Sequence, residues 1–183
     1  MKKNIDIKEI LIPSVSLFVI CVLVTALLAI TNDVTAPKIE ALALEQAAET
    51  RMVVLPTASE FEATEDESVY MGIDSAGNLV GYAISVTQKG YGGEIEIMVG
   101  INSDGSVSGV SILSHNETPG LGANATKDTF LSQYKGASDA QKVTKDGGEI
   151  DSITGATITS RAVTNAVNSA LEKYNAIEGG AAV

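Results

Sequence analysis

The sequence DSITGATITSRAVTNAVNSAL, residues 151–171, predicts a short polar turn that runs directly into an amphipathic helix. Apolar residues then recur at spacings of three and four, which is the period of one helix face. These residues are Val163, Ala166, Val167, Ala170, Leu171 and Tyr174. Residues 154–157 would lie where a strand gives way to this helix. The stretch therefore predicts a strand–turn–helix unit whose helix packs on a sheet.

The turn at residues 154–157 has features that suit an anion. Gly155 and Ala156 bring the backbone close to whatever lies above the turn. Free N–H groups and the positive end of the helix dipole point at the same place, which favours a phosphate. The hydroxyl groups around it belong to Thr154, Thr157, Thr159 and Ser160. The simpler alternative is that Thr154 and Thr157 only cap the helix, because Ser and Thr are preferred there.

Composition limits the possible partners of the chain. Its 183 residues suit one globular domain plus an appendage. The net charge of −11 argues against nucleic acid as a partner, because phosphate backbones need a basic footprint. Trp is absent and aromatic residues are 4%, so no base-stacking surface is expected. The single cysteine excludes an intramolecular disulfide and a multi-cysteine metal site.

Residues 10–30, ILIPSVSLFVICVLVTALLAI, form an uncharged apolar run. At about 1.5 Å per residue, a helix of this length spans a hydrocarbon core of about 30 Å. The alternative is a cleaved signal peptide, whose apolar region is about 7–15 residues long and ends at a small-x-small site. This run is longer, and residues 29–31 make a poor cleavage site. We therefore predict an uncleaved transmembrane helix.

The lysines of residues 1–9 precede the span, which by the positive-inside rule places the N-terminus in the cytoplasm. The part of the chain after the span would then lie on the outer face of a cell (inner) membrane, tethered by a single span. Cys21 lies inside the span, where it either fills space in a packed helix or contributes to a shared intramembrane redox centre. Residues 31–56 are predicted to form a helical stalk that begins near Pro37 and ends at Pro56.

Residues 57–183 are predicted to form one domain dominated by strands. The expected strands are residues 69–73, 79–86, 94–101 and 107–113. In the third of these, Ile95, Ile97, Val99 and Ile101 alternate with the period of a strand face. Short turns join the strands, so the sheet should be mainly antiparallel. The expected fold class is α+β: one transmembrane helix, then a twisted antiparallel sheet packed by helices on one side.

Three further segments complete the expected domain. Residues 57–67 are acidic and without a period, so we expect a loop or one helical turn. Residues 127–134 should form a short helix and residues 136–148 a polar loop. Two glycine-rich segments, KGYGG at 89–93 and HNETPGLG at 115–122, flank predicted strands. Either they let the backbone lie flat against a bulky planar ligand, or they are ordinary loops.

The order KGYGG, strand pair, HxETPGLG and DxITGATxTS resembles the FMN-binding domain family, over residues 69–174. Within it the chain is most similar to G subunits of the Rnf complex, a membrane-bound, ion-translocating ferredoxin:NAD oxidoreductase. C subunits of the sodium-pumping NADH:quinone reductase are near relatives. The TGATxTS segment resembles the flavinylation motif of this family.

The resemblance implies that Thr157 carries FMN through a phosphoester that a separate flavin transferase makes from FAD. It also implies that Gly155 and Ala156 leave room for the phosphate, while Thr154, Thr159 and Ser160 hydrogen-bond it. The flavin ring or ribityl chain would be flanked by Glu117, Thr118, Gly120, Leu121 and Gly122, with Tyr91 at the ring edge. Asp151 would support the turn or assist the transferase. His115 would either order a strand end or tune the flavin.

The implied function is electron transfer within a redox-driven ion pump, in contact with the other membrane subunits of an Rnf-type complex. No complete activity is expected from this chain alone, because it has neither a GxGxxG fingerprint nor iron–sulfur cysteines. No catalytic residue and no metal ligand is predicted. Three alternatives remain. They are a membrane-tethered flavin-binding or redox-sensing domain that takes no part in pumping, a subunit of the related NADH:quinone reductase, and a stand-alone extracellular reductase.

Overall fold

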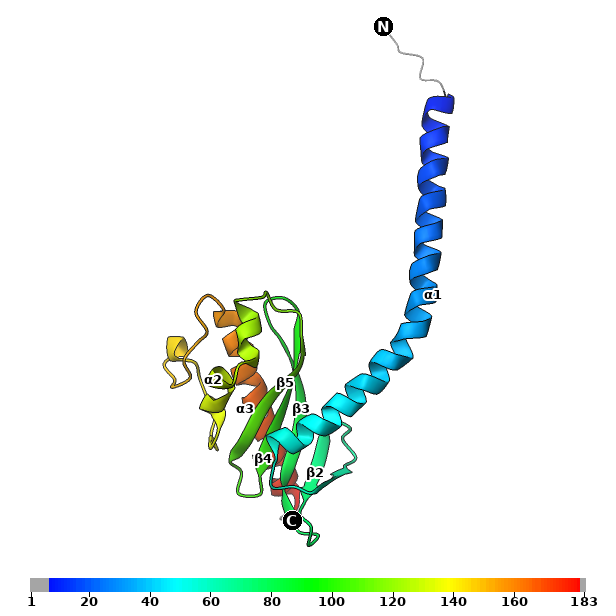
Figure 1. Ribbon diagram of the computed structural model, residues 1–183. Coiled ribbons are helices and arrows are strands. Elements are labelled where there is room, and N and C mark those ends of the chain that lie inside the picture. Colours follow the sequence, from blue (N-terminus) through cyan, green and yellow to red (C-terminus); the bar gives the residue numbers. More distant parts are fainter. Residues whose placement is uncertain (1–6, 182–183) are drawn as a thin grey trace. The chain divides into compact units, whose positions relative to one another are not determined.

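The computed structural model describes residues 7–181 (Figure 1). Residues 1–6, which belong to the predicted cytoplasmic segment, lie outside the described residues. The chain divides into two compact units, with the boundary between Glu45 and Gln46. Helix α1, Ile7–Val54, runs through that boundary. Its last turns therefore belong to the same unit as the sheet.

Helix α1 contains the apolar run predicted to cross a membrane. Among the described residues it is the one helix long and apolar enough to do so, with a mean hydropathy of 2.7 in its best window. Pro13 and Pro37 both lie inside the helix, so the expectation that a separate helix begins near Pro37 is wrong. Proline removes one backbone hydrogen bond, but the Ala-, Leu- and Glu-rich sequence that follows favours continuation of the helix.

Five strands form one antiparallel sheet with the order β1-β2-β3-β4-β5. They are β1 Glu60–Ala63, β2 Val69–Ile73, β3 Leu79–Lys89, β4 Glu94–Asn102 and β5 Val107–His115. The predicted antiparallel sheet is confirmed. The expectation of a loop or helical turn at residues 57–67 is wrong for β1, which pairs Glu60 with Ile73 and Ala63 with Tyr70. Its charged side chains suit an edge strand.

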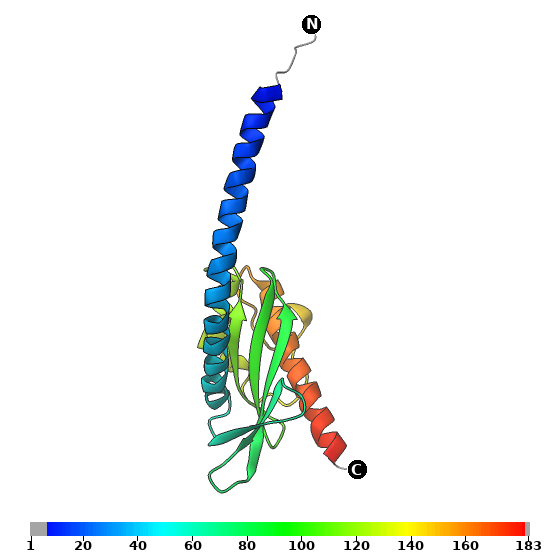
Figure 2. The ribbon, with the colours of Figure 1, turned by 90° about the vertical axis from the view of Figure 1, so that its right-hand side faces the viewer.

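Helix α3, Thr157–Ala181, covers one face of the sheet (Figure 2). All six residues of the predicted apolar stripe are buried, from Val163 to Tyr174. They pack against the alternating face of β4, where Ile95, Ile97 and Val99 are 0% exposed. This packing confirms the expected helix-on-sheet arrangement.

The other face of the sheet is covered as well. Val54, at the end of α1, packs with Ala83 of β3 and Met98 of β4. Gly100 lies so close to this helix end that an added Cβ would collide with the Val54 carbonyl. The expectation that helices lie on one side only is therefore wrong. Small and apolar residues on the second face let the helix end approach the strands closely.

Short helices and loops connect β5 to α3. They are η1 Gly122–Thr126, α2 Asp128–Leu131, η2 Ser132–Tyr134 and η3 Thr144–Asp146. The helix expected at 127–134 is thus one α-turn followed by a 3₁₀ turn. The strand expected before residue 154 is wrong. Only an isolated bridge joins Val143 to Ile150, because the Asp151 backbone binds the Gln133 side chain instead of a neighbouring strand.

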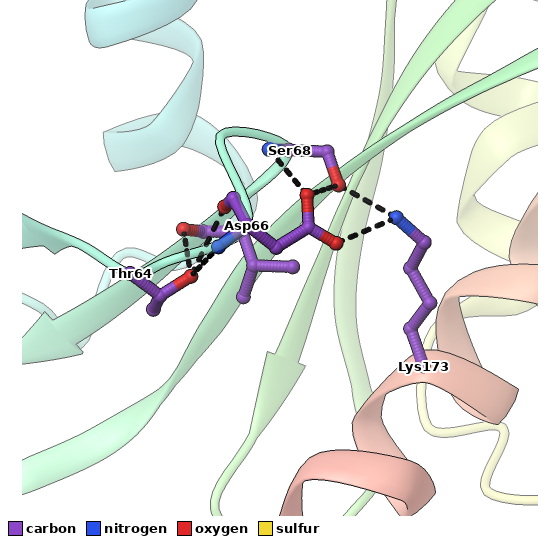
Figure 3. A network of polar contacts seen from close by, with 5 residues as sticks. Thr64, Asp66, Ser68 and Lys173 are labelled. Atoms are coloured by element: carbon purple, nitrogen blue, oxygen red, sulfur yellow. Dashed lines mark hydrogen bonds and ion pairs between the residues drawn. The ribbon is translucent and has the colours of Figure 1, made fainter.

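A polar network joins the β1–β2 turn to α3 (Figure 3). Asp66 accepts hydrogen bonds from the N–H and hydroxyl of Ser68, at 2.9 and 2.7 Å. The ammonium of Lys173, on α3, lies 3.1 Å from Asp66 and 2.6 Å from the Ser68 hydroxyl. The Ser68 bonds and the Lys173 cation lower the pKa of Asp66 to about 2.

Candidate functional site

A cavity of about 390 Å³ lies where three segments meet: the β3–β4 turn, the segment after β5, and the first turn of α3. Its size falls within the range of small-molecule sites. It is lined by Tyr91, Glu117, Thr118, Leu121, Gly122, Gly155, Ala156, Thr157, Ile158 and Thr159. The structure thus brings together residues from all three of the motifs that the sequence singled out.

Glu117 joins these three segments. Its side chain is buried, with 6% of the residue exposed. One carboxylate oxygen accepts hydrogen bonds from the N–H groups of Tyr91 and Gly92, at 2.8 and 3.0 Å. The other accepts the hydroxyl hydrogen of Thr159 at 2.8 Å. Because a buried carboxylate needs such partners, the position of Glu117 fixes the position of both neighbouring segments.

Two glycines of the motifs are explained by this carboxylate. A Cβ added to Gly90 would collide with Glu117 Oε1, and one added to Gly122 would collide with Glu117 Oε2. Neither glycine has a positive φ angle, so the requirement is for space rather than for an unusual backbone. The glycine patterns therefore allow the buried carboxylate to approach the backbone.

Thr157 is half-buried at the start of α3, and its side chain lines the cavity. Gly155 has a φ of +77°, a left-handed conformation that glycine adopts readily. The helical ladder begins with the bond from Ser160 N–H to the Ala156 carbonyl, at 3.0 Å. The N–H groups of residues 157–159 precede that ladder. With the helix dipole, they make the first turn favourable for an anion.

Three predicted contact residues do not line this cavity. The buried Ser160 hydroxyl donates to the Ala156 carbonyl at 2.9 Å and accepts from Ile153 N–H at 3.0 Å. Thr154 and Gly120 are exposed and line a neighbouring groove. The ring of His115, at the end of β5, accepts the N–H of Glu117 through Nδ1 at 3.2 Å. This bond joins the end of β5 to the backbone of Glu117, and a role of His115 toward the flavin stays a prediction.

Sequence reasoning missed two residues here. Ile158 lines the cavity and is 51% exposed; its place outside the apolar helix stripe was the available signal. Lys145 donates a hydrogen bond from Nζ to Thr157 Oγ1 at 2.8 Å. No sequence pattern marks it, because it lies in a polar loop twelve residues earlier.

Comparison with known proteins assigns the class of this domain. Residues 90–172 match the FMN-binding domain family, and residues 1–54 match the RnfG N-terminal region. The chain is 39% identical to the G subunit of the ion-translocating oxidoreductase complex of Methanosarcina acetivorans, over 95% of this chain and 99% of that protein. It is 35% identical to the G subunit of the proton-translocating ferredoxin:NAD(+) oxidoreductase complex of Clostridium ljungdahlii, over 98% and 100%.

The chain belongs to the family of G subunits of ion-translocating oxidoreductase complexes, as its motifs predicted. Among solved structures, NqrC of Shewanella oneidensis is similar with a TM-score of 0.49 and 23% identity, over 63% of this chain and 66% of that one. The C subunit of the Na(+)-translocating NADH-quinone reductase from Parabacteroides distasonis is similar with a TM-score of 0.48 and 28% identity, over 58% and 59%.

The cavity residues fit an FMN group. Three apolar side chains at the cavity are exposed: Tyr91 by 72%, Leu121 by 46% and Ile158 by 51%. Such side chains suit a planar ring that remains partly open to solvent. The helix start and the Lys145 ammonium suit a phosphate. The site therefore combines an apolar surface with an anion-binding end.

Proposed function

We propose that this chain is the electron-transfer subunit of a membrane-bound, redox-driven ion pump of the Rnf type, a ferredoxin:NAD oxidoreductase. It carries FMN as a phosphoester on Thr157. The observation that carries the proposal is the position of the Thr157 hydroxyl. It lies in the wall of a ligand-sized cavity, at the start of a long helix and 2.8 Å from a lysine ammonium.

Attachment requires a flavin transferase and FAD. A bond forms between Thr157 Oγ1 and the FMN-side phosphorus of FAD, and the bond between the two phosphates breaks. AMP leaves, and the hydroxyl proton passes to a base of the transferase. The product is a phosphodiester with one negative charge. The helix start, where the N–H groups of residues 157–159 precede the ladder, then stabilises that charge.

Bound FMN supplies the redox chemistry, while the protein supplies position. We assign the ring contacts to the exposed apolar side chains of Tyr91, Leu121 and Ile158. Thr118 and Gly122 line the same cavity. Thr159 and Ser160 are already hydrogen-bonded within the protein, so they hold the turn that presents Thr157. Of the predicted hydroxyls, exposed Thr154 remains available to the phosphate.

We further propose that residues 10–30 anchor the chain as a single transmembrane span, with the N-terminus in the cytoplasm. Residues 31–56 would form the stalk, and residues 57–183 would hold the flavin on the outer face. Lysines before the apolar run support this orientation. The proposed partners are the other membrane subunits of the complex, because the similar proteins are named as subunits of such complexes.

The decisive experiment measures intact mass and maps the modified peptide in protein made in a host that has the transferase. We expect an FMN-sized addition on the peptide that contains Thr157. Thr157→Val should lose the addition and stop electron flow through the complex while far-UV circular dichroism stays unchanged. Thr57→Val, which removes an exposed threonine hydroxyl outside the cavity, is the matched control and should keep the addition.

The opposite outcome favours the second candidate function. If Thr157 is unmodified and flavin is released on denaturation, the chain is a membrane-tethered domain that binds flavin noncovalently. The exposed apolar side chains at the cavity support that interpretation without the phosphoester. An active complex that carries Thr157→Val would likewise contradict the proposed covalent carrier.

A further inference from the structure

Lys145 reaches the proposed attachment site from a different part of the chain. It lies in the 3₁₀ helix η3, Thr144–Asp146, and its Nζ is 2.8 Å from Thr157 Oγ1. An ammonium carries three N–H donors, so one bond to a hydroxyl leaves donors for further oxygens. A phosphate bonded to Thr157 Oγ1 would therefore have its other oxygens close to the Lys145 ammonium.

The loop that carries Lys145 is held in place on both sides. The Arg161 guanidinium forms a bidentate ion pair with Asp146, at 2.7 Å from Nε and 2.6 Å from Nη2. Arg161 follows Thr157 by four residues, so the two side chains lie on the same side of α3. On the other side of the loop, Thr144 N–H binds the Ile150 carbonyl at 2.8 Å. Lys145 is thus presented next to Thr157 by its immediate neighbours.

Within residues 7–181, the cavity lining has no cationic side chain that could balance the charge of a phosphate. The lining residues that the structure describes include one acid, Glu117, and neither lysine nor arginine. The whole chain carries a net charge of −11, which disfavours an entering anion. The Glu117 carboxylate is already satisfied by three donors. A phosphate at Thr157 would therefore find its counter-charge in Lys145, together with the helix start.

We propose that Lys145 is the positioning residue for the phosphate that Thr157 receives, held ready by the Asp146–Arg161 ion pair. The inference rests on the proposed attachment of FMN to Thr157. Before attachment the ammonium orients a neutral hydroxyl; afterwards it faces a phosphodiester anion. Because charge-assisted hydrogen bonds are about twice as strong as neutral ones, the contact favours the modified state and the approach of the phosphate.

The test follows flavinylation of the full-length, detergent-solubilised chain with purified transferase, FAD and Mg²⁺. Mass spectrometry gives the modified fraction with time. Lys145→Gln should slow modification about tenfold, the lower end expected for loss of a charge-assisted hydrogen bond. Lys145→Arg should stay within about twofold of the wild-type rate, because it keeps the charge. Asp146→Asn should lie between them, because it keeps the ammonium and frees the loop.

Lys142→Gln is the matched control, since it removes the same charge from a position in the same loop that does not contact Thr157. It should leave the rate unchanged. A second readout is ionic strength: the wild-type and Lys142→Gln rates should fall more steeply with salt than the Lys145→Gln rate. Circular dichroism and the melting temperature should be the same for all of these variants, which excludes a general loss of structure.

The outcomes separate this inference from the proposed function. If the wild-type chain takes up no FMN, the proposed attachment fails, and the inference falls with it. If the wild-type chain is modified and Lys145→Gln is as fast, the inference alone is overturned. Equal slowing by Lys145→Arg and Lys145→Gln would also overturn it, because charge would then not be the cause.

Discussion

Glu117 and Asp66 are two of the carboxylates that bind helix α3 to the rest of the domain, and they lie in opposite surroundings. Glu117 is buried and binds Thr159 in the first turn of the helix. Asp66 has a side chain that is 55% exposed and binds Lys173 further along the same helix. Water screens the second pair, whereas the first must be satisfied by protein donors. Similar chemistry therefore contributes very different amounts to stability.

The largest effect is expected for Glu117→Ala. The substitution leaves the N–H groups of Tyr91 and Gly92 and the hydroxyl of Thr159 without their acceptor. Of these donors only Thr159 belongs to a buried residue, whereas the bonds of Tyr91 and Gly92 are partly buried. An unsatisfied buried donor costs about 1–3 kcal/mol, and partly exposed donors cost less. We expect the free energy of unfolding to fall by about 3 kcal/mol. Urea unfolding of the full-length chain in detergent, followed by far-UV circular dichroism, measures it.

Asp66→Ala is the control for this variant, because it removes a carboxylate from the exposed network. If both substitutions destabilise the protein equally, burial does not distinguish the two networks. The fraction of folded Glu117→Ala protein that acquires FMN should also fall. The reason is that the segments lining the cavity lose the carboxylate that hydrogen-bonds to both of them.

A smaller effect is expected for Gly122→Ala. Its Cβ would press on the Glu117 carboxylate and on Thr159, and overpacking of this kind costs about 1–3 kcal/mol. Gly120→Ala is the matched variant two residues earlier. Gly120 has a φ of +78° and open space around its Cβ, so we expect a cost of about 1 kcal/mol from backbone conformation alone. Melting temperatures rank the two; the reverse order would show that Glu117 moves aside easily.

The smallest effect is expected for Asp66→Asn. The pKa of Asp66 is lowered from 3.8 to about 2, so its contribution is complete above about pH 4 and is lost as the pH falls from about 4 to 2. After discounting for solvent screening, we expect at most ~0.5 kcal/mol at neutral pH. The variant should flatten the acid side of the stability curve. An unchanged acid slope, measured by urea unfolding between about pH 2 and 5, would contradict this.

The sequence predicted best what depends on periodicity. The helical stripe from Val163 to Tyr174 and the alternating face of β4 are both buried as expected, because each pattern follows from local geometry. Periodicity did not predict elements whose secondary structure depends on pairing with a neighbouring strand. Strand β1 is acidic and irregular, and it is a strand only because β2 lies beside it. The second covered face was missed because Gly100 gives no signal of the helix end that it contacts.

For the site, the motifs predicted which residues gather but not how they do so. Tyr91, Leu121 and Thr157 line one cavity, and their contacts to FMN stay a prediction. The position of Glu117 between backbone N–H groups depends on contacts between distant segments, and no spacing in the sequence encodes it. Lys145 was missed for the same reason. Its neighbour Asp146 pairs with Arg161 across fifteen residues, and a polar loop offers no pattern from which to infer that pair.

The three bonds of Glu117 also set an order of events. They reach back 26 residues to Tyr91 and forward 42 residues to Thr159, so each closes a long loop at an entropic cost. The cavity cannot exist until the chain has been made beyond Thr159 and α3 has docked on the sheet. A nascent or partly folded chain presents Thr157 as one threonine among many. Under the proposed attachment of FMN to Thr157, we therefore expect the domain to fold before the transferase meets its cavity.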